Sequence, residues 1–241
     1  MIDSARIVAL GAAAWWLAGA GCAAAADSPP AALRPGERLG GDDFRNGLAR
    51  WVVEQQPGGT VTAEKGALVI NDAGGCTVWF RARLKAPLII VCEAKVSSAS
   101  RVSDLNFFWM ATDPARPDDL FAAGHARDGR FATYDSLRTY YVGCGGNNNT
   151  TTRFRRYDGT GARPLQPDHD LTSPDVLLQP DHVYRIKLVA ARGRVRFVRD
   201  DRVIFDFADP APLESGWFGF RTVHSRIEVS RFEVFIAKPA G

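Results

Sequence analysis

The chain has 241 residues, of which 46% are hydrophobic and 24% are charged, and its formal net charge is +3. This length suits a single all-β domain, and the apolar content is sufficient for a sizeable core. Since the charge is mild and the chain has neither a run of Lys and Arg nor zinc-finger spacing, composition argues against nucleic-acid binding.

Residues 1–26 are predicted to be a secretory signal peptide. An apolar run over residues 7–20 follows a weakly positive start, and an A-x-A pattern places cleavage after Ala26. Two alternatives stay open. Cys22 could be lipidated, although Gly19 stands where lipoproteins usually have Leu, or the run could be an uncleaved anchor, which its shortness disfavours. We therefore expect a periplasmic or secreted protein with no membrane contact beyond a lipid at Cys22.

Residues 27–40 are rich in proline and polar side chains, and they are predicted to be a tether to a domain over residues 41–238. Two hairpins are expected next, over residues 61–74 and residues 76–98. Residues 105–112 are more uniformly apolar, as expected for a strand that is covered on both faces.

Three cysteines remain after the predicted cleavage, namely Cys76, Cys92 and Cys144. Cys76 and Cys92 lie symmetrically about Leu84, at the expected hairpin turn, so they could form a disulfide in an oxidising compartment. Three buried free thiols are an equally good interpretation. No Cys/His signature supports a catalytic cysteine.

Two long connections, residues 113–132 and 160–182, flank the centre of the chain. Long loops in compact domains are usually functional, so these are candidate walls of a binding groove. Strands resume as a double hairpin over residues 183–209 and a closing strand pair over residues 216–237. The spacing of strands and turns favours an all-β sandwich of two antiparallel sheets.

This order of signals resembles a known superfamily over residues 42–236. The opening Asp-Asp-Phe, the double hairpin YRIKLVAARGRVRFVRDDRVIFDF and the ending GWFGFRTVHSRIEVSRFEVF are similar to the concanavalin A-like lectin/glucanase jelly rolls. The block from FFWMATDP to RFRRYDG resembles a narrower secreted bacterial domain family of unknown function, similar to polysaccharide lyases and 3-keto-disaccharide hydrolases. The resemblance implies a jelly-roll β-sandwich that binds carbohydrate on its concave sheet, and it leaves the chemistry open.

Residues 133–159 are the most distinctive stretch, with four tyrosines, four arginines, four glycines and three consecutive asparagines. In a strand, Arg153, Arg155 and Tyr157 share one face, and the two arginines stand about 7 Å apart, which suits a carboxylate or sulfate. Tyr140 and Tyr141 point to opposite faces. The Gly-Asn turn between the two strands is expected to adopt positive φ angles. A polar outer strand without any function is the simpler alternative.

We expect this stretch to bind, and by β-elimination to cleave, an anionic, uronate-containing oligo- or polysaccharide. Arginine and asparagine would neutralise the uronate, and a tyrosine with its pKa lowered by arginine, or a histidine, would transfer protons. The candidate catalytic residues are Tyr141, Tyr134 and His224. The candidate substrate-binding residues are Asn106, Trp109, Tyr140, Asn147, Asn149, Arg153, Arg155, Tyr157 and Arg221.

Other functions stay open at this point. A non-catalytic carbohydrate-binding module needs the same residues, whereas a glycoside or 3-keto-glycoside hydrolase would need acids, and no Glu-x-Asp-x-x-Glu strand occurs. His125 and His169 lie in the long connections, where they could line a groove, and His182 is expected in a surface turn. We expect no cofactor and no catalytic metal. A structural Ca²⁺ at Asp42-Asp43 is consistent with the resemblance.

Overall fold

The computed structural model describes residues 33–124 and 127–240. The predicted signal peptide, Cys22 and His125 lie outside these residues, so the signal peptide and the secreted location stay predictions. Within the described ranges, no helix has the length and apolar character needed to cross a membrane.

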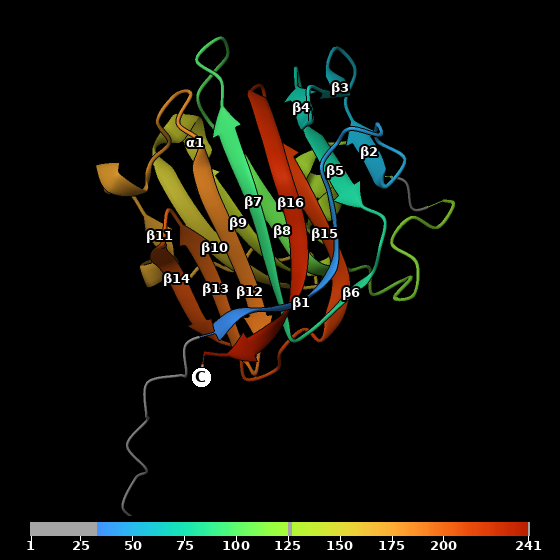
Figure 1. The fold of residues 1–241 in the computed structure, drawn as a ribbon, viewed down its shortest axis with the longest axis vertical. Helices are drawn as coiled ribbons and strands as arrows, with labels where there is room; N and C mark the ends of the chain where they lie inside the picture. The colour runs from blue at the N-terminus through green and yellow to red at the C-terminus, as the bar shows by residue number, and fades with distance from the viewer. Residues whose placement is uncertain (1–32, 125–126, 241) are drawn as a thin grey trace, which may run out of the picture. The chain divides into compact units, whose positions relative to one another are not determined.

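Two eight-stranded antiparallel sheets form the domain, and Figure 1 shows β7, β12 and β16 of one sheet layered over β8, β9 and β15 of the other. The first sheet contains, in spatial order, β14 (Arg202–Ala208), β13 (Arg194–Arg199), β12 (Tyr184–Ala191), β7 (Leu88–Val96), β16 (Arg226–Pro239), β4 (Ala67–Asn71) and β3 (Thr60–Glu64), with β1 (Leu33–Asp42) beside β16. The second sheet contains β11 (Asp170–Leu171), β10 (Thr151–Asp158), β9 (Arg138–Gly145), β8 (Leu105–Thr112), β15 (Ser215–Thr222), β5 (Cys76–Phe80) and β2 (Trp51–Gln55), with β6 (Leu84–Lys85) beside β15. The short helices are η1 (Phe131–Tyr134), α1 (Gly146–Asn149), η2 (Pro167–His169) and η3 (Pro174–Val176).

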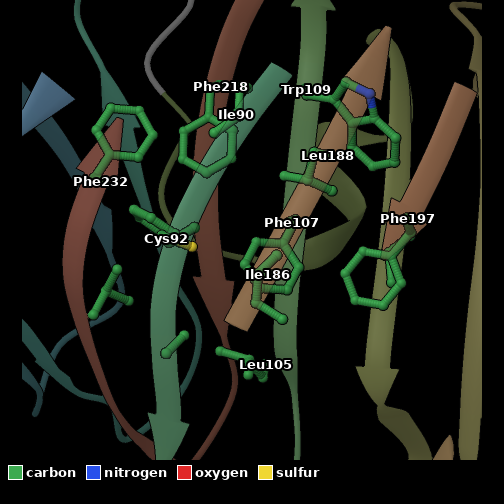
Figure 2. Close-up of a cluster of buried hydrophobic side chains, with 14 of the residues drawn as sticks. Ile90, Cys92, Leu105, Phe107, Trp109, Ile186, Leu188, Phe197, Phe218 and Phe232 are labelled. Carbon is green, nitrogen blue, oxygen red and sulfur yellow. The ribbon is translucent and has the colours of Figure 1, made fainter. Parts of the chain in front are cut away.

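The main hydrophobic core lies between the two sheets. Alternate residues of each strand point into it, as the period of two requires, and Figure 2 shows Phe107 and Trp109 of β8 in one cluster with Ile90 and Cys92 of β7. All four side chains are at least 96% buried. The sandwich predicted from strand spacing is therefore confirmed.

A second, smaller core covers part of the outer face of the second sheet. The connection 113–137 folds over this face and packs Leu120 and Tyr134 against Trp79 and Phe108. Its buried Arg127 donates hydrogen bonds to Glu54 of β2, at 3.0 Å and 3.3 Å. Such a pair is costly to break, because removing one partner leaves the other as a buried charge without its nearest counter-charge. The uniformly buried strand β8 is explained by this second layer, which confirms that both of its faces are covered.

Several predicted strand pairs are confirmed, and one hairpin is wrong. β3 pairs with β4, β9 with β10, and β12 with β13, which then pairs with β14. The expected hairpin over residues 76–98 does not form, because β5 and β7 belong to different sheets. The closing strands β15 and β16 are also split between the sheets. In strands that are apolar on both faces, the local sequence does not indicate which strand is the partner. The passages of the chain from one sheet to the other were therefore not predicted.

Cys76, Cys92 and Cys144 are free and buried. Cys76 lies on β5 and Cys92 on β7, in opposite sheets, so of the two open interpretations the disulfide across a hairpin is wrong and the three buried free thiols are confirmed. Burial raises the pKa of both thiols far above the ordinary value.

The predicted tether over residues 27–40 is wrong from Leu33 onward. Strand β1 begins there and pairs with β16, with Leu33 opposite Pro239 and Asp42 opposite Phe232. The proline and glycine residues of this segment are tolerated because β1 lies at an edge and its register is broken by bulges.

Candidate functional site

A row of polar residues crosses the outer face of the second sheet. Asn106 of β8 pairs with Arg221 of β15 on one side and with Gly143 of β9 on the other, and Gly143 pairs with Arg153 of β10. Residues paired across antiparallel strands point to the same face. The side chains of Arg221, Asn106 and Arg153 therefore lie in one row, in which Gly143 contributes no side chain.

An aromatic row lies two residues further along the same strands. Trp79 is paired with Gly219, Gly219 with Phe108, and Phe108 with Tyr141. The connection 113–137 covers most of this row, whereas the polar row is left open. The sheet therefore presents polar side chains beside an aromatic border.

The open part of the outer face is a hollow with a volume of about 240 Å³. Phe131, from the connection 113–137, and Arg163, from the connection 159–183, form its walls. Arg163 joins the two connections, because its Nε donates to Asp135 Oδ1 at 2.7 Å and its guanidinium lies 4.7 Å from the centre of the Phe131 ring. The two predicted groove walls thus lie beside each other.

Cations outnumber anions in the hollow. Arg153 forms a two-pronged ion pair with Asp170, at 2.7 Å and 3.0 Å. Arg155 instead donates to the backbone carbonyls of Arg163 and Pro164, at 2.6 Å and 3.2 Å, and no carboxylate in the described part of the chain pairs with it. Its charge is therefore not paired directly with a carboxylate of the described residues.

Asp104 is the single carboxylate among the described residues that line the hollow. Its Oδ2 accepts hydrogen bonds from Arg101 at 2.8 Å and Ser103 at 2.6 Å. Its Oδ1 accepts a hydrogen bond from Asn106 Nδ2 at 3.3 Å. Asn106 is 99% buried, and no described residue donates a hydrogen bond to its Oδ1 atom. A buried acceptor without a protein donor is costly unless water or a ligand supplies one.

Arg221 reaches away from the centre of the hollow. Its Nη1 donates to Thr77 Oγ1 at 3.0 Å and to the Gly129 carbonyl at 2.9 Å. The guanidinium also lies 4.9 Å from the Phe131 ring and 5.0 Å from the Tyr134 ring. Arg221 therefore lines the hollow and also fixes the segment that carries Phe131.

Among the candidate tyrosines, Tyr141 lines the hollow, whereas Tyr134 and Tyr157 are buried beside it. Burial raises the pKa of Tyr141 and Tyr134 strongly and that of Tyr157 to about 12. The expected lowering by arginine is wrong, because desolvation outweighs the attraction of Arg221 and Arg155. At neutral pH these hydroxyls keep their protons and can act as hydrogen-bond donors.

Trp109 and Tyr140 point to the inner face and belong to the main core, so they leave the candidate site. The Tyr140 hydroxyl donates to Asp209 Oδ2 at 2.7 Å. Alternation correctly separates Tyr140 from Tyr141, and the structure assigns Tyr141 to the outer face.

The remaining candidates are divided between the hollow and its surroundings. Asn147 lines the hollow, and the three asparagines of α1 adopt positive φ angles of 52°, 59° and 60°, which confirms the predicted turn. Asn149 bonds the backbone of Leu178 through both of its amide atoms, at 2.8 Å, and so fixes the connection 159–183. His224 is exposed outside the hollow, and His169 packs against Phe154 rather than lining a groove.

Asp104, Phe131, Arg163 and Gly143 were not predicted as site residues. The first three lie outside the strands, where no periodicity places them. Gly143 had a usable signal, since a glycine within a strand often marks a close approach.

The calcium expectation stays a prediction. Both oxygens of Asp42 already accept hydrogen bonds, from the Phe44 backbone at 2.8 Å and from Trp51 Nε1 at 2.9 Å. In the described ranges, no group of three His, Cys, Asp or Glu side chains is placed to hold a metal ion.

Comparisons with solved structures identify the fold. A protein of unknown function with a galectin-like fold from Bacillus subtilis has a TM-score of 0.71 and 20% identity, over 87% of this chain and 100% of that chain. Carbohydrate binding module CBM66 from Bacillus subtilis has a TM-score of 0.54 and 12% identity, over 78% and 96%. The endo-beta-1,3-glucanase from Pyrococcus furiosus has a TM-score of 0.55 and 9% identity, over 84% and 95%. The concanavalin A-like jelly roll is thus confirmed, and at these identities the likeness establishes the fold alone.

At the level of sequence, residues 70–232 match the family described as "Domain of unknown function (DUF6250)". No curated protein matches the chain.

Proposed function

The chain belongs to the DUF6250 family, and we propose that it binds an anionic saccharide in the hollow on the outer face of its second sheet. The observation that carries this proposal is Arg155, which lines the hollow with backbone carbonyls as its partners and no carboxylate among the described residues. A guanidinium that is not neutralised favours a carboxylate or sulfate, with which it can form two hydrogen bonds.

A saccharide fits the other groups that line the hollow. Phe131 and Tyr141 line the hollow and supply aromatic carbon that can contact a sugar ring, and the Tyr141 hydroxyl can donate a hydrogen bond. Asp104 and Asn106 offer acceptors for sugar hydroxyls. The carbohydrate-binding module and the glucanase with the same fold support this ligand class by analogy.

Binding without cleavage accounts for the geometry best. β-Elimination from a uronate requires a base, and the raised pKa of Tyr141 makes its hydroxyl a poor base at neutral pH. Elimination stays the second candidate, because Tyr141 is paired directly with Arg155 across β9 and β10. Hydrolysis by two carboxyl groups has less support, since Asp104 is the one carboxylate among the described lining residues.

Calorimetric titration with oligogalacturonate, and with a neutral oligosaccharide of the same length, tests the proposal. We expect the anionic ligand to bind more tightly, and added salt to weaken it, because exposed charges are screened. Arg155→Ala should weaken binding about ten- to hundredfold, the usual effect of losing a charged hydrogen-bond donor. Arg185→Ala is the matched control, since Arg185 is exposed on β12 of the other sheet and pairs with Asp201.

Absorbance of the same mixtures in the near ultraviolet separates the two candidates. Binding without an unsaturated product supports a binding module, whereas an unsaturated product that disappears in Tyr141→Phe supports elimination. Equal affinity for the anionic and neutral ligands, or an equal loss in both arginine variants, would overturn the anion site.

A further inference from the structure

Across three neighbouring strands, the hollow has a buried acceptor on one side and two arginines on the other, while Arg221 beside Asn106 is already bonded to Thr77 and Gly129. Asn106 stands on β8, the cations Arg153 and Arg155 stand on β10, and Gly143 lies between them on β9. Since neighbouring strands lie about 4.8 Å apart, β8 and β10 are separated by about 10 Å. The hollow in this gap, with a volume of about 240 Å³, has room for one sugar ring beside the Tyr141 ring, which covers Gly143.

Asn106 has its amide orientation fixed by its neighbour. The carboxylate of Asp104 can only accept hydrogen bonds, so the Asn106 amide must turn its Nδ2 toward it, and the contact is 3.3 Å long. Asn106 lines the hollow, and its Oδ1 atom is left as a buried acceptor without a donor among the described residues. A ligand hydroxyl is a donor that would satisfy it.

The opposite side of the hollow carries two guanidinium groups, which can only donate hydrogen bonds. Arg155 has no carboxylate partner there among the described residues, and Arg153 adds a second guanidinium that Asp170 partly neutralises. A ligand that satisfies both sides therefore carries a hydroxyl on one edge and an anionic group on the other. A hexuronate ring has this arrangement, since its carboxylate lies across the ring from its vicinal hydroxyls.

We propose that the hollow recognises a single hexuronate unit lying between β8 and β10, beside the Tyr141 ring, with Asn106 Oδ1 accepting a hydrogen bond from a ring hydroxyl and Arg155 binding the carboxylate. This inference rests on the proposed function and adds to it the unit that is recognised and its orientation. Asn106 becomes the residue that distinguishes a sugar acid from other anions.

Three probes of similar size separate the two halves of this recognition. Methyl galacturonoside has both the hydroxyls and the carboxylate, methyl galactoside has the hydroxyls without the charge, and cyclohexanecarboxylate has the charge without the hydroxyls. We expect the wild-type protein to bind methyl galacturonoside most tightly in ligand-observed NMR titrations.

The two variants should lose affinity for different probes. Asn106→Ala should weaken binding of methyl galacturonoside about tenfold and change binding of cyclohexanecarboxylate less than about twofold, because only the sugar donates to Oδ1. Arg155→Ala should instead abolish the preference for methyl galacturonoside over methyl galactoside. Thermal unfolding of each variant establishes that it is folded, and Arg185→Ala again serves as the control.

The outcomes distinguish this inference from the function on which it rests. If the wild type binds both anions equally, or if Asn106→Ala weakens both equally, the hydroxyl contact is wrong while the anion site survives. If neither anionic probe nor oligogalacturonate binds, the proposed function itself fails. Because the first of these comparisons uses the wild type alone, the test holds even if Asn106→Ala does not fold.

Discussion

Gly143 sets the shape of the hollow at the scale of a single residue. A Cβ added at this position would lie 3.1 Å from the Tyr141 hydroxyl oxygen and 3.2 Å from its Cε1 atom. The Tyr141 ring therefore extends along β9 over the backbone of Gly143, where it packs 4.8 Å from the Phe108 ring centre. Because Gly143 has no side chain, the Tyr141 ring can lie along β9 at the border of the polar row.

Gly143→Ala is expected to displace the Tyr141 ring and weaken binding of oligogalacturonate about tenfold. The free energy of unfolding should fall by about 1 kcal/mol, because the added methyl group crowds a contact that is already close. Calorimetric titration and urea unfolding measure the two effects. Gly40→Ala is the control, since its Cβ would meet Phe80 at 3.9 Å, an ordinary contact. Unchanged affinity in Gly143→Ala would contradict a binding role for the Tyr141 ring.

Prediction at the level of single residues succeeded where the alternation of side chains along a strand alone decides which face of the sheet a residue occupies. It separated Arg153, Arg155 and Tyr157 from Phe154, and Tyr141 from Tyr140. It could not exclude Trp109, because β8 is apolar on both faces and the connection 113–137 buries the outer one. Nothing in a strand pattern reveals that a distant connection will cover it.

At the scale of an element, the connection 159–183 is attached to the sandwich through His169. The imidazole packs edge-on against Phe154, Phe207 and Phe205, with ring centres 5.0, 5.6 and 5.9 Å away. Burial lowers the pKa of His169 below its ordinary value of 6.5. The folded protein therefore favours the neutral ring, whereas the unfolded chain accepts a proton more readily.

This difference predicts a loss of stability on acidification. Above about pH 6.5 His169 is neutral in both states, and as the pH falls from there toward the lower folded pKa the unfolded chain gains the proton first, which lowers the free energy of unfolding. His169→Gln should be less stable than the wild type at about pH 7 but should lose less stability between about pH 7 and pH 5. Urea unfolding at both pH values measures this, with His224→Gln as an exposed control. Equal losses in wild type and His169→Gln would rule out His169 as the source.

Hairpins were the elements that the sequence predicted best. Each of β3–β4, β9–β10 and β12–β13 has a turn signal and paired strands that follow each other in the chain. The failures are strands that leave one sheet for the other, such as β5 followed by β7. Their partners lie far away in sequence, and two apolar inner faces accept either strand equally well.

At the scale of the whole molecule, the three described cysteines are buried residues that come from both sheets. Cys76 comes from the second sheet, and Cys92 from the first. Cys144 lies on β9 with its sulfur 3.2 Å from Arg199 Nη1, yet burial still raises the pKa of the thiol. Because the thiolate is the reactive form and all three thiols are enclosed, the folded sandwich should protect them together.

Thiol labelling of the Cys22→Ser protein, which leaves these three cysteines, tests the arrangement. Without reductant, we expect almost no reaction with an aromatic disulfide reagent under native conditions and reaction of all three thiols in denaturant. A Cys76–Cys92 bridge would leave one reactive thiol in denaturant until a reductant is added, which would contradict the free cysteines of the structure. Labelling at increasing urea should follow the unfolding transition, because global opening of the sandwich is needed to expose residues from both sheets.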